Sequence, residues 1–165
     1  MADIRFDDGF EEFTINGDPQ RVIRINPKDV NILTRFEKSM KELKEESSSI
    51  SDIEVRADGS LAEMQHSKLS ENARRLQEFN ESINEKLNYI FNADVTSAAF
   101  GRQSPLSLTG RDNRFLFEVF LESALEAVKE RLEKAAKSME DRAAKYSGAY
   151  KKAEMNGKKY PFPVE

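Results

Sequence analysis

Apolar and polar residues alternate along the first part of the chain, from Phe10 to Ile25. Phe13 and Ile15 precede Asn16-Gly17, and apolar residues resume after it. Asn-Gly between alternating apolar residues is a strong signal for a β-hairpin, although Pro19 predicts a loop longer than two residues. Because an isolated two-stranded hairpin is marginally stable in water, we expect its apolar face to rest on a helix or on another chain.

A first helical pattern begins at Asn26-Pro27, where a residue that favours the N-cap is followed by proline. Apolar residues at spacings of three and four then predict one buried face. The residues on that face are Val30, Leu33, Phe36, Met40 and Leu43. The helix is expected to end at Glu46, because the composition from Ser47 through Gly59 is that of a connector.

A second, longer helical pattern covers residues 60–91. Its apolar residues follow a three-four rhythm, which predicts contact with another helix of the same chain or of a second chain. Asp94 is then placed to cap a short helical turn over residues 95–100. Gly101 is expected to end that turn in the left-handed conformation.

A third helix is predicted from Asp112 or Asn113 to about Ser147. It opens with aromatic residues and ends rich in alanine, so its first turns should be the best buried. Beyond Gly148, two prolines predict an extended tail. The expected fold is therefore mainly α, with an N-terminal β-hairpin (about 10–25), three amphipathic helices and an extended C-terminal tail. We expect a single helical domain over 1–147 and a flexible, basic, proline-containing tail over 148–165.

Composition and charge narrow the function classes. Hydrophobic residues make up 38% of the chain and charged residues 34%, a balance typical of long helices with narrow apolar stripes. The net charge of −4 does not favour a nucleic-acid-binding module. The charged residues among the first eighteen are mostly acidic and those among the last twenty-one are mostly basic, which indicates either two solvated ends or attraction between copies of the chain.

No pattern of catalytic or metal-binding residues emerges from the sequence. The absence of cysteine excludes thiolate nucleophiles, Cys-ligated zinc and disulfides, and His66 is the one histidine. Gly157-Lys158-Lys159 lacks the earlier glycine and the following Ser or Thr of a P-loop. We therefore expect no enzymatic activity, no cofactor and no metal. With no apolar stretch of membrane-spanning length and no signal peptide, a cytoplasmic location is expected.

Aromatic residues are the candidates for partner binding. One group consists of Phe91, Phe100, Phe115, Phe117 and Phe120, which either face a partner protein or form the ordinary hydrophobic core. The other lies in the tail, where Tyr160 and Phe162 alternate with prolines. That tail segment is either a disordered end or a linear peptide that docks in a groove of a neighbour.

The stretch from Ile83 to Gly101, followed by the helical pattern from Phe115 to Leu132, resembles the tail assembly chaperones of long-tailed bacteriophages. In that family a helix leads into a short capped turn that closes in Phe-Gly, here Phe100-Gly101, and a loop then precedes another amphipathic helix. The long charged third helix and the lysine-rich tail depart from the family pattern. The resemblance covers about 40% of the chain.

This resemblance implies a non-enzymatic factor in the cytoplasm of a bacterial host cell. Such a factor coats the tape-measure protein, forms homo-oligomers, and recruits tail-tube subunits before it leaves the finished tail. The alternative is a phage minor structural or scaffold protein that is retained in the particle. Two further hypotheses are less favoured. One is a nucleic-acid-associated regulator that uses Lys145 to Lys159, and the other is an enzyme with a carboxylate site.

Overall fold

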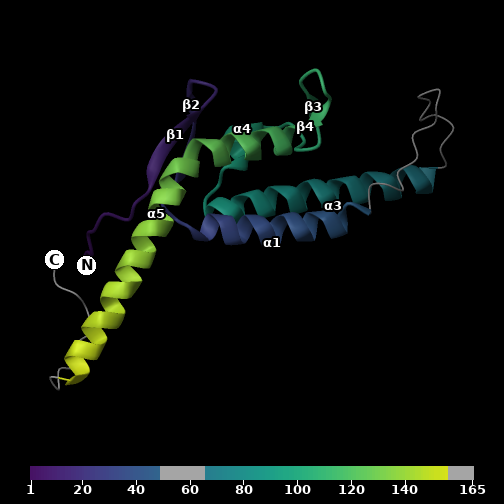
Figure 1. Ribbon diagram of the computed structural model, residues 1–165. Helices are drawn as coiled ribbons and strands as arrows, with labels where there is room; N and C mark the ends of the chain where they lie inside the picture. Colours follow the sequence, from purple (N-terminus) through teal and green to yellow (C-terminus); the bar gives the residue numbers. More distant parts are fainter. Residues whose placement is uncertain (49–65, 156–165) are drawn as a thin grey trace.

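The computed structural model describes residues 1–48 and 66–155, with side chains described for 1–48 and 70–148. It confirms a mainly α fold with an N-terminal hairpin followed by helices. In chain order the elements are β1 (Glu11–Ile15), β2 (Asp18–Ile25), α1 (Asn31–Glu46), α3 (His66–Phe91), α4 (Thr96–Phe100), β3 (Leu108–Thr109), β4 (Arg114–Phe115) and α5 (Leu116–Met155). Figure 1 shows α1 and α3 side by side, while α5 first passes near the hairpin and then projects away from the other elements.

The predicted hairpin is present, but its loop has two residues. Asn16 and Gly17 both have positive φ, at 52° and 72°, as a type I′ turn requires. The antiparallel register is regular from Glu11↔Ile25 to Thr14↔Val22 and then shifts before Ile15↔Asp18. Pro19, which has no backbone N–H to donate, lies within this irregular part of β2. A bulge in the strand thus accommodates the proline, and the loop itself stays short.

Helix α1 begins at Asn31, four residues after the predicted start at Asn26-Pro27. The Asn26 side-chain oxygen accepts the N–H of Lys28 at 3.0 Å, and the Asp29 carboxylate accepts the N–H of Asn31 at 3.0 Å. These local hydrogen bonds hold turns in the segment before the helix. The sequence signal at Asn26 therefore marks a turn and not the helix N-cap.

The buried face of α1 also differs from the prediction. Ile32, Ser39 and Leu43 are buried, whereas Leu33 is 49% exposed. Leu43 was predicted correctly, and Phe36 and Met40 are partly buried. In this stretch a three-four spacing can be drawn through either of two adjacent positions, and only the tertiary packing places Ile32 in the core.

Helices α1 and α3 run antiparallel, and hydrogen bonds and ion pairs join them at both ends of their contact. At one end, the Arg35 guanidinium donates to the carbonyl of Ile90 at 2.9 Å and to the Asp29 carboxylate at 2.7 Å. At the other end, the Lys86 ammonium lies 2.9 Å from the Glu46 carboxylate, which also accepts a hydrogen bond from Ser82. Burial raises the pKa of Glu46, but the hydrogen bonds from Ser82 and Lys86 and the Lys86 charge outweigh it, so the net pKa is lowered.

The apolar stripe of α3 is satisfied within the chain over its described C-terminal half. Phe79, Ile83, Leu87 and Ile90 are all buried in the core. The first residues of the predicted pattern, 60–65, lie outside the described part of the chain. The described half of this stripe is therefore not a free surface for a second chain.

The short helix α4 is held by side chains from the preceding segment. The predicted capping residue Asp94 accepts the N–H of Ser97 at 3.2 Å, and Asn88 accepts those of Val95 and Thr96 at 2.8 and 3.1 Å. Gly101 ends the helix with φ of 58° and ψ of −117°. The positive φ was predicted, but this ψ lies outside the left-handed helical region and is accessible essentially to glycine alone.

Helix α5 begins and ends differently from the prediction. The strand pair β3–β4 comes first, so Phe115 lies in a strand and α5 starts at Leu116. The early turns are the better buried, as expected, with Leu121, Val128 and Leu132 in the core. The helix then continues without a break through residues 147–148 to Met155, which corrects the predicted extended tail over 149–155. Residues 156–165 lie outside the described part of the chain.

The assignment of the buried face of α1 can be tested by substitutions at two adjacent residues, Ile32 and Leu33. Ile32→Ala should lower the free energy of unfolding by about 2–5 kcal/mol, because it opens a cavity at a fully buried position. Leu33→Ala should cost less than about 1 kcal/mol, because half of that side chain is already in water. Urea unfolding followed by circular dichroism measures both. A larger loss for Leu33→Ala would place the other face of α1 in the core.

The interactions of Glu46 with Lys86 and Ser82 predict a pH-dependent contribution to stability. Because its pKa in the folded state is lowered from 4.5, the contribution is complete above that value and is lost as the pH falls through the folded pKa. Glu46→Gln should therefore lower the urea midpoint at pH 7, and the difference from the unsubstituted protein should shrink at pH 3. The exposed neighbour Glu45 supplies the matched control, Glu45→Gln. If Glu46→Gln lowers the urea midpoint equally at both pH values, the ionised Glu46 carboxylate does not stabilise the fold.

Candidate functional site

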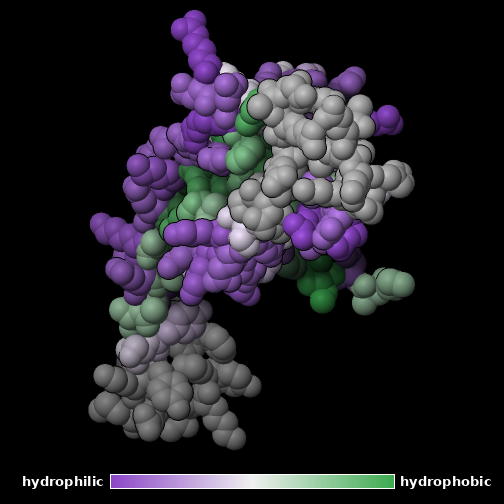
Figure 2. Space-filling view, turned by 90° about the vertical axis from the view of Figure 1, so that its right-hand side faces the viewer, coloured by the Kyte–Doolittle hydropathy of each residue, from purple (hydrophilic) through white to green (hydrophobic). Residues whose placement is uncertain are grey.

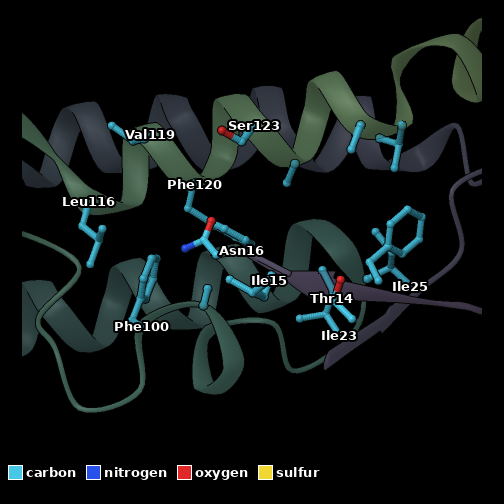
Figure 3. A pocket seen from close by; sticks show the side chains of 15 residues that line it. Thr14, Ile15, Asn16, Ile23, Ile25, Phe100, Leu116, Val119, Phe120 and Ser123 are labelled. Atoms are coloured by element: carbon cyan, nitrogen blue, oxygen red, sulfur yellow. The ribbon is translucent and has the colours of Figure 1, made fainter. Parts of the chain in front are cut away.

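An apolar groove lies where the hairpin, α4 and α5 meet, and Figure 3 shows it from close by. Its volume is about 240 Å³. Its walls are Phe13, Thr14, Ile15, Asn16, Ile23 and Ile25 from the hairpin, Ala99 and Phe100 from α4, and Leu116, Val119, Phe120, Ser123, Ala124, Ala127 and Val128 from α5. Three elements far apart in the sequence therefore form one surface.

The groove exists because each wall is fixed by a polar contact at its edge. The Arg21 guanidinium of β2 donates to the carbonyls of Ala98 and Ala99 in α4, at 2.9 and 2.8 Å. On the other side, Arg131 of α5 pairs with the Glu11 carboxylate of β1 and lies over the ring of Phe13, 5.5 Å from its centroid. These contacts attach the hairpin to both helices while the space between them stays open.

Phe120 is the aromatic residue at the centre of the groove. Its ring makes edge contacts with Phe100, at a centroid distance of 5.5 Å, and with Phe91, at 6.3 Å. In Figure 3 its side chain extends from α5 toward Ile15 and Asn16 of the hairpin. Phe120 is partly buried, whereas Phe91 and Phe100 are buried. One side chain thus belongs both to the core and to the groove wall.

The predicted aromatic group is divided between the core, the groove and a second depression. Phe91 lies in the core, while Phe100 and Phe120 line the groove. Phe115 and Phe117 stack on each other at 6.0 Å. Phe117 lines a separate depression of about 270 Å³ between α1 and α5, together with Phe36 and Met40. The tail residues Tyr160 and Phe162 lie outside the described part of the chain.

Sequence reasoning missed most of the groove wall. Phe13, Ile15, Ile23 and Ile25 occupy one face of the hairpin, and their alternation in the sequence was the available signal. On α5, Ser123 and Ala127 are small residues one turn apart that leave the groove open. Small residues at helical spacing are too common to mark a site without knowledge of what lies opposite them.

The chemistry of the groove is that of a binding surface. None of its lining residues carries an ionisable side chain, and its polar members are Thr14, Asn16 and Ser123. Such a surface offers hydrogen bonds and apolar contact but no side chain that acts as an acid or a base near neutral pH. In the described part of the chain, no three His, Cys, Asp or Glu residues lie together as a metal site requires. His66 begins α3, and its side chain is not among those described.

Acidic residues lie along one side of the groove. Glu122 and Glu126 border the adjoining surface that includes Val119 and Ser123, and Arg114 pairs with Glu122 at 2.7 Å. Glu126 makes no ion pair with any residue for which a side chain is described. The mouth of the groove is therefore apolar within and acidic along the α5 side.

Figure 2 shows the face that lies at the right of Figure 1, where hydrophobic residues form small groups between hydrophilic ones. Among the described helices, none combines the length and the apolar character that crossing a bilayer requires. Comparison with known proteins gave no match to this chain among family models, curated sequences or solved structures.

The double role of Phe120 predicts a large effect of a charge at that position. Phe120→Asp should lower the free energy of unfolding by about 3 kcal/mol or more, because it places a carboxylate without a partner against Phe91 and Phe100. Ser123→Asp, one turn further along the same groove wall and exposed, should cost less than about 1 kcal/mol. Thermal unfolding compares the two. Equal melting temperatures would show that Phe120 does not contribute to the core.

Proposed function

We propose that this chain is a non-enzymatic protein-binding factor whose groove receives an apolar segment of another polypeptide. The observation that carries this proposal is the groove itself: an open, apolar surface without ionisable lining residues. Hydrophobic contact in such a surface favours binding of side chains, and the few polar groups orient the bound segment.

The size of the groove supports a peptide over a small-molecule ligand. Sites for small molecules and cofactors usually have volumes of roughly 300–1,000 Å³. The groove, at about 240 Å³, is smaller and matches a few side chains of an extended or helical segment.

In its specific form, the proposal is a tail assembly chaperone of a long-tailed bacteriophage, acting in the cytoplasm of a bacterial host cell. Its clients are the tape-measure protein and, during assembly, tail-tube subunits. The resemblance of Ile83 to Gly101 to that family motivates the choice of client. The exposed second half of α5, with Met139 56% exposed, supplies a further surface for helical partners.

A second candidate is a minor structural or scaffold protein that stays in the particle. The observation in its favour is that α5 continues from Leu132 to Met155, and the side chains described beyond Ala136 are mostly exposed. A helix that is solvated in the free chain gains packing if it is permanently assembled with others. Presence in purified particles distinguishes this candidate, because an assembly chaperone is absent from them.

A substitution that fills the groove tests the proposal. Ala127→Trp adds a large side chain at an exposed position of the groove wall, and Ala73→Trp makes the same change at an exposed position of α3, outside the groove and outside the second half of α5. Co-expressed with a phage tape-measure protein as client, the unsubstituted chain and Ala73→Trp should co-purify with it. Ala127→Trp should reduce the recovered client about tenfold or more. Equal recovery with both variants would exclude the groove as the client site.

A further inference from the structure

The sequence of this chain contains a segment whose composition suits the groove. We propose that the segment Tyr160-Pro161-Phe162-Pro163 of one copy docks into the groove of a second copy. This inference rests on the proposed function only in treating the groove as a peptide-binding site. It adds that the chain is its own ligand, so that a client must displace a neighbouring copy.

The chemistry of the segment matches that of the groove. Two aromatic side chains separated by proline can enter an apolar surface walled by Phe13, Phe100 and Phe120. Proline restricts the backbone before binding, so less conformational entropy is lost when such a segment is held extended. Aromatic-lined grooves bind proline-rich peptides for this reason.

Charge complementarity supports the same occupant. Lys158 and Lys159 immediately precede the aromatic segment. Glu122 and Glu126 lie along the α5 side of the groove, next to Ser123 and Ala127 of its wall. Arg114 already pairs with Glu122 at this surface, so these three side chains leave a net charge of −1. A docked aromatic segment brings two ammonium groups to this acidic surface, where attraction accelerates association and weakens with salt.

The length of α5 excludes docking within one copy. Val128 is the lining residue nearest the C-terminal end of α5, and the helix continues unbroken from there to Met155, which corresponds to about 40 Å. Phe162 follows Met155 by seven residues, which span at most about 25 Å even when fully extended. Figure 1 shows the end of α5 far from the hairpin. The segment can therefore reach only the groove of another copy.

Docking of this kind is head-to-tail. The surface that receives the segment differs from the surface that supplies it, so the contact is heterologous, and copies assemble into a ring or an open chain. Each copy keeps one groove and one segment. A client that occupies the groove removes one contact between two copies. Client binding is thereby coupled to disassembly of the oligomer.

A labelled peptide of residues 156–165 tests the docking directly. Its binding to the full-length chain is followed by fluorescence polarisation, with Ala127→Trp and Ser123→Trp as groove variants. The exposed Ala73 on α3 supplies the control variant, Ala73→Trp. We expect saturable binding to the unsubstituted chain and to Ala73→Trp, and binding weakened about tenfold or more by each groove variant. Circular dichroism verifies that each variant is folded.

Changes in the peptide separate the apolar and ionic contributions. Phe162→Ala should weaken binding about tenfold, because it removes an aromatic anchor. Replacing Lys158 and Lys159 by glutamine should weaken binding less and should remove most of its dependence on salt. No binding of the peptide, or equal binding to the groove variants and the control, overturns the proposal.

Self-association of the intact protein completes the test. Sedimentation should show oligomers of the unsubstituted chain and mainly monomers of Phe162→Ala and Ala127→Trp. Full-length Phe162→Ala keeps its own groove and should still bind the tape-measure client. If the client binds but the peptide does not, docking between copies is overturned and the proposed function stands. If the peptide binds but the client does not, docking stands and the proposed function is overturned.

Discussion

The structure depends on how an isolated two-stranded hairpin covers its apolar face. Two strands cannot bury that face themselves, so Ile23 and Ile25 must pack on helices. Arg21 attaches β2 to the carbonyls of α4, and Arg131 attaches β1 to α5 through Glu11. The two attachments lie at the edges of the hairpin, and the helices that they bring together do not close over its centre. The groove is the space that remains.

The remaining helices make this arrangement rigid. Helices α1 and α3 form an antiparallel pair that is joined at both ends, by Arg35 and by Lys86. The C-terminal end of α3 then fixes α4, because Asn88 accepts the first N–H groups of that helix. Phe120 of α5 contacts Phe91 of α3 and Phe100 of α4 edge to face, and so packs α5 against these two helices. The wall of the groove is thus continuous with the core, so its shape is set before any ligand arrives, which lowers the entropic cost of binding.

The two halves of α5 differ in burial. Its first half supplies core residues such as Leu121 and Val128 on one side and the small groove residues Ser123 and Ala127 on the other. Its second half contributes little to the core and ends at Met155, far from the hairpin. In the proposed docking between copies, the groove beside the first half of α5 receives the segment that follows the end of this helix in the sequence. Such association suits a factor that assembles with other proteins and later releases them.

The sequence by itself determined where the hairpin and the longer helices α1, α3 and α5 lie, because alternation and helical spacing are local properties of the backbone. It missed the two-residue length of the hairpin loop, the β3–β4 pair and the continuation of α5 to Met155. It did not determine which of two adjacent positions, Ile32 or Leu33, faces the core, because that choice depends on how α1 packs on the rest of the chain. Nor did it identify the groove: the predicted aromatic group holds only Phe100 and Phe120 of its fifteen lining residues. Periodicity fixes which residues share a face of one element. Only tertiary packing decides which faces of different elements meet, and whether they close or leave a space.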